Sequence, residues 1–171
     1  MKKAFTMIEL IFVIVILGIL AAVALPKFIG VAEQAREGNL KGFVGTLNRT
    51  VGPTLWSKAI NSGNNGDISK LSIKLEDYTD IPKEIDKSKL DITKCNHISD
   101  FKVIAEAPKV NMGGDYNYYV VCRTGTNGVA PKFELVKTKS NLNLGDANKS
   151  NLYGGGTIKI GSAIDVELVT K

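Results

Sequence analysis

Residues 5–25 read FTMIELIFVIVILGILAAVAL, an apolar run whose polar members, Thr6 and Glu9, lie near its start. As a helix this segment would extend roughly 31 Å, about the hydrocarbon thickness of a bilayer. Two lysines precede it, and no basic residue follows before Lys27. Because positive charge stays on the cytoplasmic side, the pattern predicts one membrane-length helix with the remainder of the chain exported.

Glu9 is the exceptional residue of this run. An acid inside a membrane span costs on the order of 3 kcal/mol and usually has a specific partner. Within the chain only Lys2 and Lys3 can reach it. If the chain were cut before Phe5, the free amine of Phe5 on a neighbouring molecule would also be a suitable partner. The alternative is that Glu9 lies close enough to the helix end to extend its carboxylate to the headgroups.

The first nine residues, MKKAFTMIE, resemble the N-terminal signal of type IV pilins and type II secretion pseudopilins. In that family a prepilin peptidase cuts before the aromatic residue, methylates the new amine and releases the subunit for filament assembly. The resemblance implies cleavage between Ala4 and Phe5, methylation of the Phe5 amine, and an assembly role for Glu9 against the next subunit's amine. Ala4 replaces the glycine usual in the family, so processing requires that the peptidase accept alanine.

The resemblance also implies partners and a location. The implied partners are a prepilin peptidase, an inner-membrane assembly platform and other pilin-like subunits. The implied location is first the inner membrane, with the N-terminus cytoplasmic and the C-terminal domain periplasmic, and then the filament. Gly18 and Pro26 match family positions that bracket a stretch able to unwind on assembly. Because proline lacks an amide hydrogen and clashes with the preceding turn, we expect a helix kink at Pro26; alternatively Gly18 is an ordinary small residue of a membrane helix.

An ordinary secretory signal is the rival interpretation. Ala22-Val23-Ala24 has the A-x-A form of a cleavage site after a basic and then an apolar region. Cleavage there would release a soluble domain that begins at Leu25. Glu9 within the apolar run, the length of that run, and the helical pattern that continues beyond the site all favour the filament signal.

The helix is predicted to continue to about Ile60, because apolar residues recur at three- and four-residue spacing. This stripe consists of Val31, Ala35, Phe43, Val44, Leu47, Val51 and Leu55. Gly52-Pro53 should kink or interrupt the helix, and Asp67 suits the N-cap of a short helix after the loop 61–66. We therefore expect a leader at 1–4, a membrane or filament-core helix at 5–26, an amphipathic helix at 27–60 and a β-rich head at 61–171.

After Cys95 the pattern changes to the alternation and β-branched content typical of strands. The predicted strands are 101–107, 116–124, 132–138, 157–160 and 164–169, with 124–128 as a hairpin turn. The fold class is α+β: a long N-terminal helix packed on one face of an antiparallel sheet of four or five strands, which is also the pilin architecture. The family motif itself covers only about the first 30 residues.

Cys95 and Cys122 are the two cysteines. In an exported domain a disulfide between them is the simplest state, and it would stabilise the fold by about 3–4 kcal/mol in the chain-entropy model. A pair of buried free thiols is the alternative. His97 is the sole histidine, and Cys95-x-His97 with one further cysteine is one ligand short of a structural zinc site, so we expect an exposed loop histidine.

No catalytic residues or cofactor site are predicted, since the chain has no nucleophile elbow, P-loop or dinucleotide motif. The loop 146–150 has oxygen ligands at alternate positions but lacks the glycine and glutamate of a calcium loop. The net charge is +5 and basic residues are scattered, which gives only weak support for a nucleic-acid partner. The alternative to a metal site at 146–150 is a polar surface loop.

The function that this sequence favours is a structural filament subunit, not an enzyme. In the family that the N-terminus resembles, major pilins often carry an adhesive disulfide loop close to the C-terminus, whereas Cys122 lies well before Lys171. This favours a pseudopilin or minor pilin of the type II secretion or DNA-uptake kind. A major type IV pilin is the first alternative, and an ordinary secreted or membrane-anchored binding domain is the second.

Overall fold

The computed structural model describes residues 5–108, 110, 115–139, 141–144, 158–160 and 163–169. The chain forms two compact units, Met1–Ala35 and Arg36–Lys171. Helix α1 (Met7–Thr46) contributes to both, and a π-helical turn, η1 (Leu47–Val51), and helix α2 (Gly52–Asn61) follow it directly. The predicted long helix is therefore confirmed.

The interruption predicted at Gly52-Pro53 takes the form of the π turn η1. Proline at the start of α2 has no amide hydrogen to donate, and the Gly52 amide bonds to the carbonyl of Leu47, one residue further back than in an α-helix. A Cβ at Gly52 would lie 2.7 Å from that carbonyl and 3.2 Å from Cε2 of Phe133. Glycine thus allows the widened turn to lie close against the sheet.

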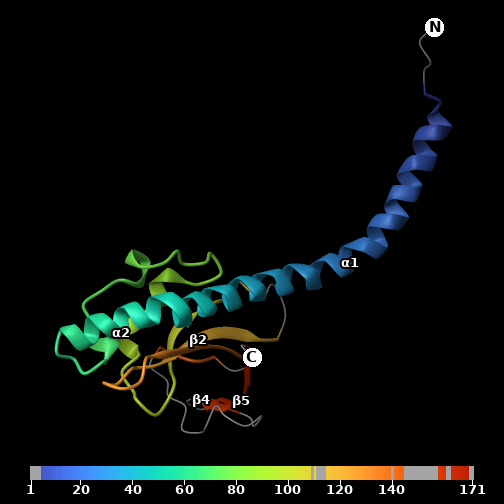
Figure 1. Cartoon of the computed structure of the whole chain (residues 1–171). Coiled ribbons are helices and arrows are strands. Elements are labelled where there is room, and N and C mark those ends of the chain that lie inside the picture. The colour runs from blue at the N-terminus through green and yellow to red at the C-terminus, as the bar shows by residue number, and fades with distance from the viewer. Residues whose placement is uncertain are drawn as a thin grey trace. The chain divides into compact units, whose positions relative to one another are not determined.

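Five antiparallel strands form one sheet in the order β1-β2-β3-β5-β4. They are β1 (Lys102–Glu106), β2 (Asn117–Arg123), β3 (Lys132–Thr138), β4 (Ile158–Ile160) and β5 (Ala163–Leu168). The α+β class and the predicted strand positions are confirmed (Figure 1). The turn between β2 and β3 closes with Thr126 and Val129 bonded to each other.

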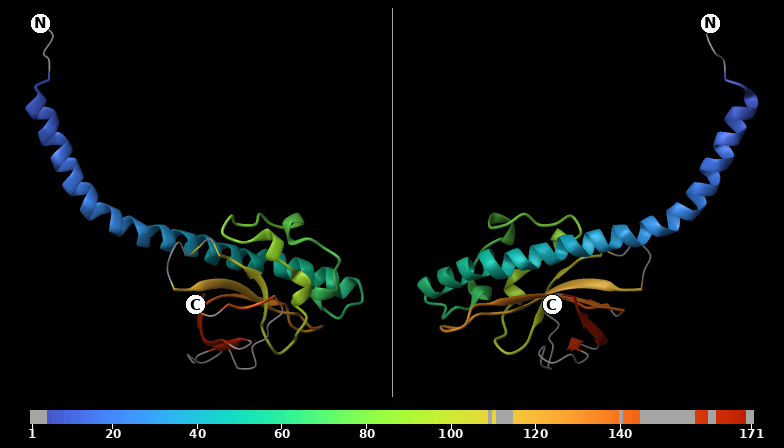
Figure 2. Two further views of the ribbon diagram at one scale, coloured as in Figure 1. Left: turned by 180° about the vertical axis from the view of Figure 1, so that it is seen from behind. Right: turned by 45° about the vertical axis from the view of Figure 1, so that its right-hand side comes forward.

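One sheet face packs on the helices of the unit Arg36–Lys171. Figures 1 and 2 show the C-terminal part of α1 and α2 lying along the sheet. The shared core contains helix residues, sheet residues and loop residues that are nearly inaccessible to water, among them Leu40, Val44, Leu47, Leu55, Ile68, Ile104, Val120, Phe133 and Leu135. Most of the predicted helical stripe is therefore buried as expected.

For the first two residues of that stripe, the prediction of burial was wrong. Val31 is 59% exposed and Ala35 is also exposed. Both belong to the unit Met1–Ala35, whereas the buried members from Phe43 onward belong to the unit that contains the sheet. Spacing alone identified the correct helix face but not where along the helix its burial begins.

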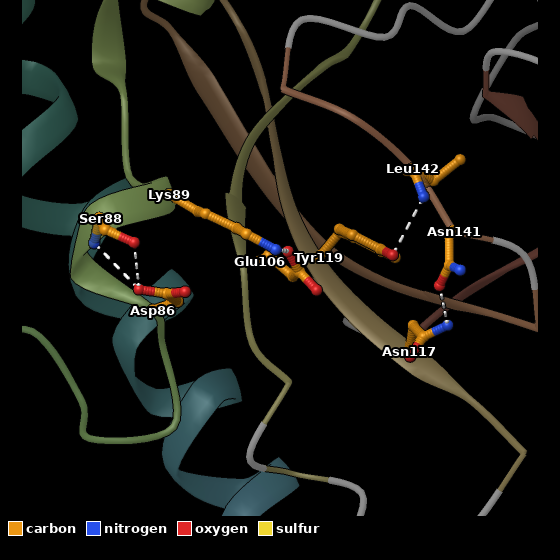
Figure 3. Close-up of polar contacts among 8 residues, drawn as sticks. All are labelled: Asp86, Ser88, Lys89, Glu106, Asn117, Tyr119, Asn141 and Leu142. Carbon is orange, nitrogen blue, oxygen red and sulfur yellow. Dashed lines mark hydrogen bonds and ion pairs between the residues drawn. The ribbon is translucent and has the colours of Figure 1, made fainter.

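The opposite sheet face has a second core, which was not predicted from the sequence. Phe101, Val103, Tyr119, Val121, Val136, Leu142 and Val166 form it. The Tyr119 hydroxyl accepts a hydrogen bond from the Leu142 amide at 3.0 Å, and the Asn117 amide donates to Asn141 at 3.0 Å (Figure 3). These bonds fix the segment after β3 over β2, so the sheet is covered on both faces.

Three short 3-10 turns share one capping pattern, Asp-x-Ser/Thr-Lys. In each, the aspartate accepts a hydrogen bond from the amide two residues later, in the turns η2 (Ile68–Lys70), η4 (Lys87–Lys89) and η5 (Ile92–Lys94). The predicted cap at Asp67 is confirmed. This connection also covers the edge of β1: the amides of Asp86 and Asp91 bond to β1 carbonyls, and Lys89 pairs with Glu106 (Figure 3).

Asn48 joins the π turn to the sheet. Its amide group donates to the Phe133 carbonyl at 2.7 Å, and its oxygen accepts from the Phe133 amide at 2.9 Å. Phe133 is fully buried, so removing Asn48 leaves a buried donor and a buried acceptor unpaired.

We expect Asn48→Ala to lower the free energy of unfolding by about 2–6 kcal/mol, since each of the two unpaired buried groups costs about 1–3 kcal/mol. The measurement is urea unfolding of the detergent-solubilised full chain. Asn61→Ala is the matched control, because Asn61 is exposed and makes no side-chain hydrogen bond in the described part of the chain. Equal midpoints for the two variants would contradict the role of Asn48.

Glu37 gives the fold a pH dependence. Its carboxylate accepts from the Tyr118 hydroxyl at 2.9 Å and pairs with Lys41 at 2.9 Å. Burial raises the pKa of Glu37, but hydrogen bonds from Lys41 and Tyr118 and the charges of Lys41 and Lys137 outweigh it, so the pKa lies below the ordinary value of 4.5.

Because the folded pKa of Glu37 is lower than its unfolded pKa, the stabilisation is complete above about pH 4.5 and is lost as pH falls through the folded value. We expect Glu37→Gln to lower stability at neutral pH and to make little difference in acid. Urea unfolding of the full chain at both pH values measures this. A deficit of the same size in acid would mean that charge is not the cause.

Candidate functional site at the start of the N-terminal helix

Thr6 and Glu9 form a capping box at the start of α1, which begins at Met7. The Glu9 carboxylate accepts from the Thr6 amide at 2.9 Å and from the Thr6 hydroxyl at 2.8 Å. In return the Thr6 hydroxyl oxygen lies 3.4 Å from the Glu9 amide nitrogen, which donates to it. The Thr-x-x-Glu spacing thus satisfies backbone donors that the first helical turn otherwise leaves unpaired.

In the capping box, one of the two Glu9 carboxylate oxygens accepts both hydrogen bonds from Thr6. Both bonds from Thr6 end on Oε2, and Oε1 accepts no hydrogen bond within the described residues. An ionised carboxylate has about four acceptor positions, so Oε1 can still take a bond from an amine or another donor. Phe5, whose amide nitrogen would become the amine after cleavage, directly precedes Thr6 and is 88% exposed.

The helix that follows has a continuous apolar surface. Met7–Leu25 spans 19 residues with a mean hydropathy of 3.0, long and apolar enough to cross a membrane, and none of it is buried within the chain. The large apolar side chains from Ile8 to Leu25 are all exposed. A surface of this size requires a lipid or protein environment; the same length and composition also fit an N-terminal signal sequence.

The other predicted residues of this segment lie as follows. Ala4 is outside the described residues. Gly18 and Pro26 both lie inside α1, and the helix continues through both positions. A Cβ at Gly18 would meet nothing within 4 Å. The kink at Pro26 stays a prediction.

The cysteines are joined as predicted. Cys95 follows η5 and Cys122 lies on β2, with their Cα atoms 5.3 Å apart and both side chains fully buried. His97 is largely exposed, and its Nδ1 accepts from the Asp100 amide at 3.2 Å. The described residues contain no group of three or more potential metal ligands, and the loop 146–150 lies outside them.

Glu9 was predicted from the sequence as a functional residue, whereas Thr6 was not. The signal that would have found it is the spacing Thr6-x-x-Glu9, which is that of a capping box before an apolar run. Asn48 was also missed, because its partner Phe133 lies 85 residues further along the chain.

Comparison with known proteins identifies the class of this N-terminus. Residues 1–25 match the model of the prokaryotic N-terminal methylation motif. The match includes Ala4, Phe5 and Glu9, so the capping box lies inside the segment that is similar to this motif.

A particular relative agrees with this assignment. The chain is 53% identical over 38 residues to the type IV narrow pilus major component PilA5 of Thermus thermophilus. The aligned part is 22% of this chain and 33% of the relative, so it spans about a third of that protein. The predicted resemblance to type IV pilins is confirmed for the N-terminal segment. No solved structure matches the chain.

Proposed function

We propose that this protein is a structural subunit of a type IV pilus-like filament, assembled through its N-terminal helix. The observation that carries the proposal is the match to the methylation motif at residues 1–25. The motif lies on an exposed, membrane-length helix, and Oε1 of Glu9 at its start accepts no hydrogen bond within the described residues. The homologous N-terminus of a pilus component supports it.

In this proposal the leader stays cytoplasmic while the C-terminal unit is exported to the periplasm, because the leader lysines precede the span. A prepilin peptidase cuts between Ala4 and Phe5 and methylates the Phe5 amine. Before assembly, the mature subunit is a single-pass protein of the inner membrane. An assembly platform extracts it into the filament.

Glu9 registers each subunit against its neighbour. The Phe5 amine of one subunit binds Oε1 of Glu9 on the next, while Oε2 keeps its bonds to Thr6. The pairing neutralises two charges inside an apolar filament core, where either charge alone is costly. Ile8–Leu25 supplies the apolar surface between subunits, and Gly18 and Pro26 allow the helix to adjust.

Within this class we propose a pseudopilin or minor pilin of the type II secretion or DNA-uptake kind. The position of the disulfide supports this assignment: β3, β4 and β5 follow Cys122, so the disulfide does not close a loop at the end of the chain. A major pilin is the second candidate, favoured by a relative that is itself a major pilus component. Nucleic-acid binding has only the weak support of a net charge of +5.

Shearing of intact cells tests the proposal. We expect the chain in the membrane fraction and, where the assembly machinery is active, in the sheared surface fraction. Without the prepilin peptidase it should remain at precursor size in the membrane. Recovery of all mature chain as a soluble periplasmic domain would instead establish the secretory alternative with cleavage after Ala24.

A further inference from the structure

An open groove of about 570 Å³ lies between α1 and the loop 79–84, within the unit Arg36–Lys171. Asn39, Phe43 and Thr46 of α1 form one wall, and residues 79–84 form the other. The groove therefore has helix side chains of mixed character on one side and, on the other, a loop that ends in the acid Glu84.

Glu84 is a buried acid that no lysine or arginine of the described residues pairs with. It is 2% exposed, and the hydrogen bond given to its carboxylate comes from the Asn39 amide at 3.3 Å. Within the described residues it forms no ion pair. Glu134, the other buried acid among the described residues, has Lys132 at 2.7 Å. A neutral amide compensates only part of the cost of removing a carboxylate from water, so Glu84 lacks the partner that a buried charge requires.

A second acid shares the groove. Asp80 is exposed, lines the groove and forms no ion pair within the described part of the chain. Lys83 also lines it, but it is exposed and pairs with neither acid. The groove thus has acceptor oxygens for a cation that the described chain itself does not supply.

The helix surface beside the groove carries glycine, and so no side chain, at three positions. Gly38, Gly42 and Gly45 each precede a groove residue of α1, and a Cβ at any of them would meet nothing within 4 Å. A glycine inside a helix costs about 1 kcal/mol relative to alanine, and no contact within the described chain requires one here. These positions leave space for another chain to approach the groove.

We propose that this groove is a docking site for a second copy of the chain, which places a lysine or arginine side chain against Glu84 and Asp80. The inference rests on the proposed function, since a filament holds copies in contact. The chain carries suitable cations: its net charge is +5, and the exposed Arg49 and Lys74 form no ion pair in the part that the structure describes. Ammonium and guanidinium groups donate charge-assisted hydrogen bonds to carboxylates.

Glu84→Gln separates a docking role from a structural one. If Glu84 binds a cation only when a second copy docks, the neutral variant removes an unpaired buried charge from the free subunit. The free subunit should then unfold at the same or a higher urea concentration than the wild type. Filament yield should nevertheless fall at least about tenfold, because the incoming cation loses its partner. Glu76→Gln is the matched control, since Glu76 is an exposed acid paired with Lys87 at 3.5 Å. A Glu84→Gln subunit that is less stable, with assembly reduced only in proportion, would overturn the proposal.

Photo-crosslinking identifies the occupant. A photoreactive phenylalanine replaces Lys83 at the groove, or Ser57, an exposed residue of α2, as control. In filaments we expect the Lys83 probe to form crosslinked dimers that contain a Lys- or Arg-bearing peptide of a second copy, and the Glu84→Gln background to give at least about tenfold fewer. Filaments without such dimers, or crosslinks to a different protein, would overturn the inference. A chain that forms no filaments and has no methylated Phe5 would instead overturn the proposed function.

Discussion

Replacing Glu9 by valine should leave the chain in the membrane while filament yield falls by about two orders of magnitude. Valine makes the span more apolar, so insertion is not impaired. Assembly would then bury the Phe5 amine of the neighbouring subunit without its carboxylate, and breaking one side of a buried ion pair costs about 3–5 kcal/mol.

The capping box predicts a smaller effect for its other member. Thr6→Val removes the hydroxyl but keeps the amide that donates to Oε2 and leaves Oε1 free, so only a helix cap worth about 1 kcal/mol is affected. Membrane fractions and sheared filaments of the two variants should be quantified together. Normal filament yield from Glu9→Val, with normal processing, would refute the pairing of Glu9 with the amine.

The double variant Cys95→Ala/Cys122→Ala should lose about 3–4 kcal/mol of unfolding free energy, because the open chain gains conformational entropy when it unfolds. The disulfide joins the turn η5 to strand β2 of the sheet, and the two cysteines are 27 residues apart in the sequence. Both cysteines are fully buried, so reductant should act only when the fold opens.

Urea unfolding of the detergent-solubilised full chain, with and without reductant, measures this effect. The wild-type midpoint should fall in reductant to near that of the double variant, whose own midpoint should not change. If reductant leaves the wild-type midpoint unchanged after complete unfolding and refolding, the disulfide does not stabilise the fold.

The strands were predictable because their side chains alternate or are β-branched, and the hairpin turn 124–128 lies between two such runs. The second core was not predicted, although Tyr118-Tyr-Val-Val121 is apolar on both sides of β2, a pattern of strands covered on both faces. The position of β5 between β3 and β4 depends on contacts between distant residues, which local patterns do not contain.

Of the two acids discussed as functional residues, one was predictable from the sequence and the other was not. Glu9 was evident because an acid in an apolar run contradicts its surroundings. Glu84 was not, because one acid in a polar turn, Ile81-Pro-Lys-Glu-Ile85, has the composition of an exposed loop. Its burial follows from packing against α1, 45 residues earlier in the chain, and from the bond to Asn39.

N-terminal mass spectrometry of the mature chain, recovered from membranes and from sheared surface material, tests the central claim most directly. A chain that begins at Phe5 with a methylated amine is the result that this account predicts, and it would also establish that the peptidase accepts Ala4. A mature chain that begins at Leu25 would lack Glu9 and the whole apolar helix surface, and it would contradict the filament function.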